Sequence, residues 1–148
     1  MLQRIQTLYL LLVVILGTLL CFFSPVDFLL PEATDYVHMN LFSCLRAGWQ
    51  TVPFAISILV IPVLALVDIF LYRKRILQAR LNIFTVVFCL GFYAIMAVYI
   101  WFAKKTLDAT PYITIWASIP LISMILTLMA TRRILKDEAL VRAADRIR

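Results

Sequence analysis

The chain has 148 residues, of which 64% are hydrophobic and only 15% are charged, and its formal net charge is +6. A soluble domain of this length usually has about half apolar and about a quarter charged residues, so this composition excludes an ordinary soluble domain and predicts a membrane protein. The basic balance also raises the question of a nucleic-acid partner, but the charges form short patches beside apolar runs without an aromatic and basic platform, so we expect no nucleic-acid binding.

Four uncharged apolar runs predict four transmembrane helices. The runs cover 5–26, 47–67, 81–103 and 109–131, and each exceeds the roughly 18 to 20 residues that cross ~30 Å of hydrocarbon. A transmembrane β-barrel needs shorter segments of alternating polarity, which these runs lack. The predicted fold class is therefore all-α, a single membrane domain of four helices in two hairpins. Its expected parts are helices over 5–24, 49–72, 81–103 and 111–131, an outer loop over 25–48 and a cytoplasmic helical tail over 132–148.

The first run also has the alternative interpretation of a cleaved signal peptide, because Arg4 precedes it. The run is long for a signal peptide, and no A-x-A-like cleavage site follows near Cys21. We therefore expect the first helix to be retained.

Lysine and arginine residues are distributed unequally between the two sides of this arrangement. With the amino terminus in the cytoplasm, eleven of the 14 basic residues fall on the cytoplasmic side, and Arg46, Lys104 and Lys105 fall on the other. Basic residues in short loops favour the cytoplasm. Both termini are therefore predicted to be cytoplasmic.

The second and fourth runs share a sequence pattern. Pro53 and Pro62 of the second correspond in spacing to Pro111 and Pro120 of the fourth, and a basic pair followed by Ile-Leu comes after each run. This pattern indicates a possible parallel duplication of one hairpin. It predicts Pro53 and Pro111 in first helical turns, where the missing N–H costs little, and Pro62 and Pro120 in mid-helix, where each removes a backbone bond.

Asp68 is the one acidic residue inside a predicted span. An ionisable group in a membrane is a functional candidate because its charge is costly to bury. Two interpretations remain open. The preferred one is a structural ion pair with Arg75, or a contact with Arg80 or Asn82 across the hairpin, and the other is a proton or cation relay.

Other polar and aromatic residues have structural interpretations. Ser123, Thr127 and Thr131 recur at every fourth position and predict close helix packing. Four aromatic residues fall near the predicted outer boundary, as expected of interfacial anchors rather than a ligand cage. They are Trp49, Tyr99, Trp101 and Tyr112.

No pattern in the sequence indicates catalysis. The outer loop has one histidine, scattered acids and one cysteine, Cys44, which do not make a metal-ligand spacing. The chain has no nucleophile with an evident base, no frame of paired catalytic carboxylates and, with three glycines in all, no phosphate-binding loop. We therefore expect no enzymatic activity, no metal and no cofactor.

The segment 132–148 carries nine charged residues of both signs. Arg133 with Asp137, and Glu138 with Arg142, are spaced as i, i+4 pairs, which favours continuation of the last helix. An orientation signal needs only basic residues. The acids therefore suggest a docking role toward a partner or the lipid surface, with a solvated helix end as the alternative.

Three stretches also carry a family resemblance. They are MLQRIQTLYLL at the start, FLYRKRILQARL from Phe70 and KDEALVRAADRIR from Lys136. Together they resemble a family of small four-span proteins from Bacteroides-type Gram-negative bacteria, known only as a domain of unknown function. The tail is the most specific stretch, although Ala143 stands where a serine is expected. The resemblance implies an inner (plasma) membrane location and the four-helix fold, and it implies no activity, substrate or catalytic residue.

All three stretches lie on the predicted cytoplasmic side, where we expect a partner surface. The predicted docking face comprises Arg4, Gln6, Arg73, Arg75, Gln78, Arg80, Lys136, Asp137, Glu138, Arg142, Asp145 and Arg146. The leading hypothesis is a non-enzymatic accessory or assembly subunit, with the lipid bilayer and either a membrane protein or further copies of the chain as partners. The alternatives are a small oligomeric transporter that uses Asp68 and a lipid-binding or lipid-modifying protein.

Overall fold

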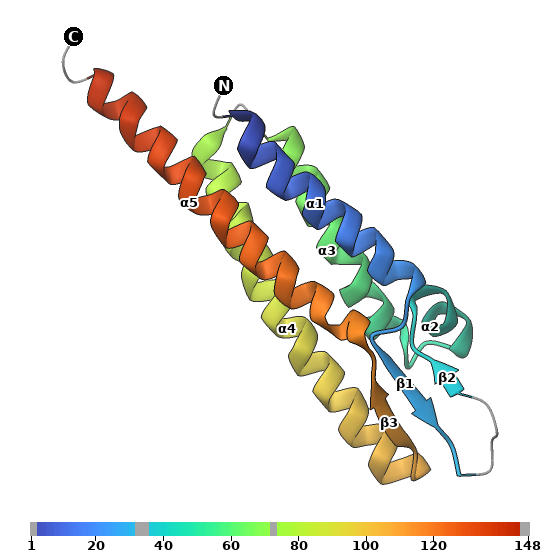
Figure 1. Ribbon diagram of the computed structural model, residues 1–148. Coiled ribbons are helices and arrows are strands. Elements are labelled where there is room, and N and C mark those ends of the chain that lie inside the picture. The colour runs from blue at the N-terminus through green and yellow to red at the C-terminus, as the bar shows by residue number, and fades with distance from the viewer. Residues whose placement is uncertain (1–2, 32–35, 72–73, 146–148) are drawn as a thin grey trace.

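In the described part of the chain, four long helices form an antiparallel bundle (Figure 1). The computed structural model describes residues 3–31, 36–71 and 74–145, without the side chains of 3–5, 75, 142, 144 and 145. The bundle helices are α1 (Gln3–Phe22), α3 (Val52–Phe70), α4 (Arg75–Leu107) and α5 (Ile119–Asp145). Helices α1 and α4 each pack against both α3 and α5, so the chain passes up and down around the bundle in sequence order. The prediction of a helical fold is confirmed.

The bundle has the composition of a membrane protein. Among the described residues, three helical segments are long and apolar enough to cross a membrane: Val52–Phe70, Ile76–Leu107 and Ile115–Val141. The segment Gln6–Phe22 of α1 is a shorter apolar helix. Large apolar side chains such as Leu11, Val63 and Val87 face outward, where lipid contact makes their exposure favourable. The chain is therefore a membrane protein, as its composition predicts.

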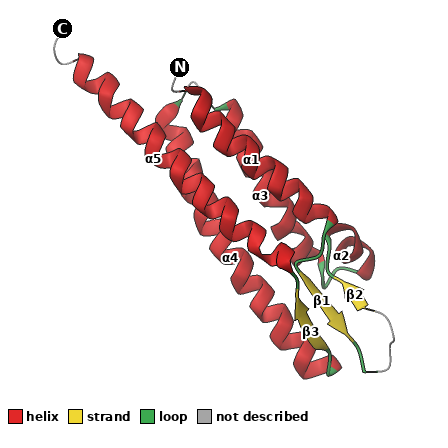
Figure 2. Ribbon diagram, in the orientation of Figure 1, coloured by secondary structure: helices red, strands yellow, loops and turns green. Residues whose placement is uncertain are grey.

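A small sheet and a short helix cover the end of the bundle opposite the start of α1 and the end of α5 (Figure 2). The helix is α2 (Leu41–Ala47), and the strands are β1 (Val26–Leu29), β2 (Tyr36–His38) and β3 (Thr110–Ile113), in the antiparallel order β2-β1-β3. Asp27 of β1 pairs with His38 on one side and Tyr112 on the other. This sheet was not predicted, since 25–48 was expected to be a loop and 111–131 a helix.

Proline positions explain two of the helix boundaries. Helix α1 ends at Phe22, and Pro25 disfavours the helical conformation at the preceding residue, Ser24. Pro53 lies at the start of α3 and Pro62 inside it, as predicted.

The corresponding prolines of the fourth run do not follow the prediction. Pro111 lies in β3, and Pro120 is the second residue of α5, so the predictions of a first-turn and a mid-helix proline are wrong. The reason is that β3 and the 3-10 helix η1 (Ile115–Ser118) precede α5 and shift its start along the chain. The two supposed copies therefore have different structures over their first halves.

The interior of the bundle divides into an apolar half near the sheet and a polar half near the other end. The apolar half includes Leu20, Phe54, Ile58 and Phe92, all fully buried. The polar half contains polar side chains that are nonetheless buried, each 8% exposed or less: Gln6, Asp68, Gln78, Asn82, Thr85, Thr127 and Thr131. The chemistry of the protein is therefore to be sought in the polar half first.

Cys44 of α2 provides a test of the packing at the sheet end. Its side chain is fully buried, its Sγ lies 3.9 Å from Met39 Sδ, and burial raises the pKa of the thiol from 9.0 to about 11. Because the thiolate is the reactive form, alkylation at about pH 8 should be slower by about 100-fold than for an unperturbed thiol, and should rise as the pH approaches that pKa.

The measurement is the rate of iodoacetamide labelling of the Cys44 peptide by mass spectrometry, with Leu45→Cys as an exposed thiol in the same helix. Equal labelling rates at positions 44 and 45 in the folded protein would contradict this packing.

Candidate functional site

Buried polar side chains lie between α3 and α4 close to the turn that joins these helices. Asp68 is in the last turn of α3, Gln78 is in the first turn of α4, and Asn82 follows one turn later. Their exposed fractions are 0%, 5% and 0%. Gln78 Nε2 donates a hydrogen bond of 3.1 Å to the backbone oxygen of Asp68. The same oxygen also accepts the backbone N–H of Leu71 at 3.2 Å. The bond from Gln78 therefore joins the capped end of α3 to α4.

The side chains of Asp68 and Asn82 are not satisfied by hydrogen bonds. Both carboxylate oxygens of Asp68, and both Oδ1 and Nδ2 of Asn82, have no hydrogen-bond partner among the described residues. A buried polar group without a partner costs roughly 1–3 kcal/mol, and a charged group costs more. Because these unsatisfied groups lower the stability of the fold, Asp68 and Asn82 are candidates for a functional site.

The carboxylate of Asp68 makes no hydrogen bond with Arg80 or Asn82, the two partners predicted across the hairpin. Arg80 is exposed, and Asn82 makes no hydrogen bond to the carboxylate. The side chain of Arg75, the other predicted partner, lies outside the described residues. Asp68 is therefore a buried acid without a described hydrogen-bond partner, and the relay interpretation stays a prediction.

Helix α5 adds hydroxyl groups to the interior. Ser123, Thr127 and Thr131 are 6% exposed or less, and the latter two donate to the carbonyl four residues earlier, at 2.7 and 2.8 Å. Their buried positions agree with the predicted packing role. Since the threonine protons are used within the helix, the hydroxyl oxygens can still accept. With Asp68, they give the interior an excess of oxygen acceptors.

A second candidate site lies where α1 begins and α5 ends. Gln6 Nε2 donates a hydrogen bond of 2.6 Å to Asp137 Oδ2, which joins α1 to α5. Helix α5 continues past this bond to Asp145 and projects beyond the start of α1 (Figure 1). Of the basic side chains that the structure describes at this end, five are exposed: Lys74, Arg80, Arg132, Arg133 and Lys136. We call these five residues the basic face.

The structure brings together only part of the predicted docking face. Gln6 and Gln78 are 8% and 5% exposed and donate hydrogen bonds inside the protein, so their assignment to an exposed face is wrong. Asp137 and Glu138 are half-buried, while Arg80 and Lys136 are exposed. The remaining predicted side chains lie outside the described part of the chain: Arg4, Arg73, Arg75, Arg142, Asp145 and Arg146.

The sequence prediction missed Lys74, Arg132 and Arg133 of the basic face. Each belongs to a basic pair that ends a predicted span. That position at the membrane boundary is the signal that could have included them.

At the sheet end, Asp27 has hydrogen-bond partners, whereas the carboxylate of Asp68 has none among the described residues. Its Oδ1 accepts a hydrogen bond of 2.5 Å from Ser24 Oγ and lies 2.9 Å from His38 Nδ1. The contact with His38 links β1 to β2. The two aspartates thus differ in their hydrogen bonding, which makes Asp27 a useful control for Asp68.

Comparison with known proteins gives a family but no relative of known function. No curated protein and no solved structure matches the chain. The family model that does match, a domain of unknown function (DUF4293), covers residues 2–147. Because this match spans nearly the whole sequence, the chain belongs to the DUF4293 family.

Proposed function

We propose that this protein is a non-enzymatic accessory or assembly subunit that docks the acidic surface of a membrane protein partner through the basic face. In this proposal the chain crosses a bacterial inner membrane four times, with both termini in the cytoplasm. Helix α1 supports a fourth crossing, because its 20 residues have a length of about 30 Å, the thickness of the hydrocarbon core. The sequence bias of eleven basic residues against three supports the orientation.

The observation that carries the docking proposal is the different exposure of acids and bases at this end. Asp137 is half-buried and accepts the bond from Gln6, whereas Arg132, Arg133 and Lys136 of the same helix are exposed. The acid holds α5 against α1, so the basic side chains project from a fixed part of the helix. A basic surface of this kind recognises an acidic partner by electrostatic complementarity.

Purification in mild detergent from the native membrane tests this proposal. The full chain carries a tag in the 32–35 segment, which leaves the basic face free. A stoichiometric membrane protein should co-purify, and the triple variant Arg132→Gln, Arg133→Gln, Lys136→Gln should lose it. Eight of the eleven basic residues on that side remain in this variant, so its orientation should be kept.

The matched control neutralises Arg46 and Lys104 at the opposite end and should retain the partner. Retention of the partner by the triple variant would exclude docking through the basic face. Recovery of the protein with anionic lipid alone would favour a lipid-surface role instead.

The bond between Gln6 and Asp137 predicts a measurable coupling. Gln6→Ala and Asp137→Ala should each lower the free energy of unfolding, and the double variant should lower it by less than their sum, by about 1–2 kcal/mol. The reason is that either change removes the same 2.6 Å hydrogen bond. Unfolding of the unmodified protein and the three variants in mixed micelles measures this coupling as a double-mutant cycle.

The control for this cycle combines Gln6→Ala with Lys136→Ala, since Lys136 is exposed. Those two changes should add within about 0.5 kcal/mol. Equal coupling in both cycles would show that Asp137 does not fix α5 against α1.

A second function, transport of a proton or cation by an oligomer of the chain, is favoured by Asp68. Its carboxylate is fully buried, without a hydrogen-bond partner among the described residues, in a helix long enough to span a membrane. The test is ion flux into vesicles containing the purified protein, with a pH-sensitive dye inside. If the protein transports ions, the vesicles should show flux, and Asp68→Asn should abolish that flux. Flux unchanged by the substitution would exclude this role.

A further inference from the structure

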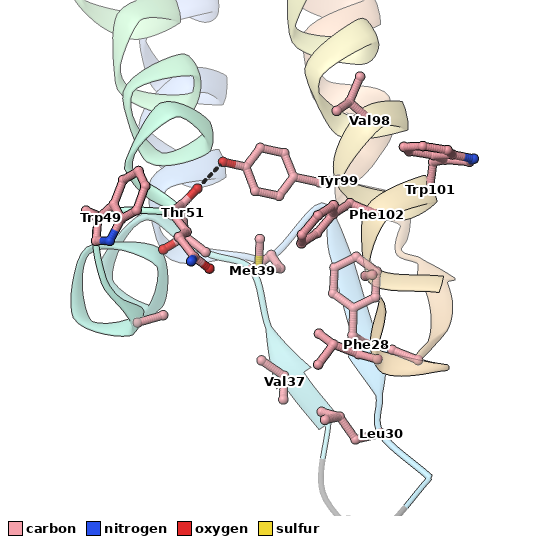
Figure 3. Close-up of a pocket in the computed structure, with 15 residues that line it drawn as sticks. Phe28, Leu30, Val37, Met39, Trp49, Thr51, Val98, Tyr99, Trp101 and Phe102 are labelled. Atoms are coloured by element: carbon pink, nitrogen blue, oxygen red, sulfur yellow. Dashed lines mark hydrogen bonds between the residues drawn. The ribbon is translucent and has the colours of Figure 1, made fainter. Parts of the chain in front are cut away.

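A cavity of about 570 Å³ lies at the sheet end of the bundle (Figure 3). Its walls come from three regions: Phe28 and Val37 from the sheet, Trp49 from the segment between α2 and α3, and Val98 and Phe102 from α4. The lining is mainly apolar and aromatic. Its volume falls within the ~300–1,000 Å³ of typical small-molecule sites. We call this space the outer cavity.

The walls of the outer cavity are held together by a hydrogen bond between distant segments. Tyr99 of α4 donates from its hydroxyl to the backbone oxygen of Gln50 at 2.5 Å. The ring of Tyr99 also packs against Phe54 of α3, with ring centroids 5.4 Å apart. The space is therefore an open cavity between anchored elements, and its walls are preformed for an apolar ligand.

With α4 across the membrane as proposed, the outer cavity would lie where the hydrocarbon meets the head groups. Val98 and Phe102 fall in the last two turns of the uncharged run 81–103, and Lys104 follows it directly. Trp49 and Trp101 line the cavity and are 82% and 62% exposed. Tryptophan is enriched at this interface. Trp49, Tyr99 and Trp101, which were predicted as simple anchors, thus also line this cavity, whereas Tyr112 does not.

A smaller and more polar hollow of about 410 Å³ adjoins the outer cavity. It is lined by Leu30, Pro31, Lys105, Thr106, Leu107 and Asp108, and it shares Leu30 and Leu107 with the larger space. The Nζ of Lys105 lies 5.0 Å from the centroid of the Trp101 ring, a cation–π distance. A positive charge is therefore held beside an apolar cavity.

We propose that the outer cavity binds one acyl chain of an anionic phospholipid from the surrounding membrane, with the head group beside Lys105. The apolar lining suits the chain, the level in the membrane suits the boundary between chain and head group, and the cation suits the phosphate. This inference depends on the transmembrane arrangement of α4 and is independent of docking at the opposite end.

Photochemical labelling in vesicles tests this site. The full chain is reconstituted with a small fraction of phosphatidylglycerol that carries a photoactivatable group on one acyl chain, and the labelled peptides are mapped by mass spectrometry. We expect labelling of α4 around Val98 and Phe102 and of the segment around Trp49. Val98→Trp, which fills the space, should reduce this labelling to the level of other lipid-facing surfaces.

The matched control is Val87→Trp, on the same helix. Val87 and Val98 are 59% and 61% exposed, but Val87 is absent from the cavity lining. The control should keep the labelling of the outer cavity. Equal labelling of the cavity in the two variants, both shown to be folded by thermal unfolding, would overturn the proposal.

The head-group contact has its own comparison. Lys105→Gln should reduce labelling by phosphatidylglycerol by about fivefold and leave labelling by photoactivatable phosphatidylcholine unchanged, while Lys104→Gln should have the smaller effect. Equal labelling by the two lipids in the unmodified protein would overturn the anionic preference. Stronger labelling by a free photoactivatable fatty acid would overturn the assignment to a phospholipid.

Discussion

Replacing Gly17 by leucine should separate α1 from α3 and markedly destabilise the bundle. A Cβ atom at position 17 would lie 3.0 Å from both Cβ and Cδ of Pro62 and 3.1 Å from its nitrogen. Pro62 is buried inside α3, and its ring is fixed to the backbone, so it cannot rotate away. Small residues at such contacts are what allow membrane helices to approach closely. Overpacking of this kind costs about 1–3 kcal/mol or more.

Thermal unfolding in detergent, followed by circular dichroism, measures the effect. We expect Gly17→Leu to lower the midpoint by roughly 5–10 °C, and Gly17→Ala to lower it by less. The matched control is Gly91→Leu in α4, because an added Cβ at position 91 meets nothing within 4 Å. Similar midpoints for Gly17→Leu and Gly91→Leu would contradict the close crossing of α1 and α3.

Replacing Asp68 by asparagine should stabilise the protein. The carboxylate is fully buried and both oxygens lack a hydrogen-bond partner among the described residues, so the substitution removes the burial cost of a charged group without breaking a described bond. The gain should be about 1–2 kcal/mol, or roughly 2–6 °C in the unfolding midpoint. The bond from Gln78 is made to the backbone of residue 68 and should remain.

Asp27→Asn is the control for this prediction. Asp27 accepts from Ser24 and contacts His38, so the same chemical change should lower stability by about 1 kcal/mol. The opposite signs distinguish an aspartate kept for function from one kept for structure. A loss of about 3–5 kcal/mol at Asp68 would instead identify a buried ion pair and would remove the main support for transport.

The helices follow from local sequence features, whereas the sheet does not. Long uncharged runs are sufficient to predict α3 and α4, since each run satisfies the length of a membrane span. Strand β1 has four residues, and its pairing with β3 joins Val26 to Ile113 across most of the chain. Such a pairing forms because the bundle brings these segments together, and no local pattern indicates it.

The sequence predicts the key residue of the candidate site, Asp68, but not how the neighbouring residues are arranged around it. Asp68 is evident from sequence because a charge in an apolar run is costly. Its missing partners depend on the rotation of α4 about its axis. Arg80 and Asn82 are two residues apart and so lie about 200° apart around a helix, and the structure buries Asn82 while exposing Arg80. Similarly, Trp49 and Trp101 line one cavity only because the sheet closes that end.

Photo-cross-linking in the native membrane shows whether the basic face contacts a partner protein. A photoreactive amino acid is placed at Leu140, which is 58% exposed on the projecting part of α5, or as a control at Ile113, which is 66% exposed at the opposite end. Docking through the basic face predicts one discrete protein adduct from position 140 and no adduct of that size from position 113. The adduct from position 140 should be lost in the Arg132→Gln, Arg133→Gln, Lys136→Gln variant. Adducts only to lipid from position 140, or an adduct that survives this variant, would contradict the account.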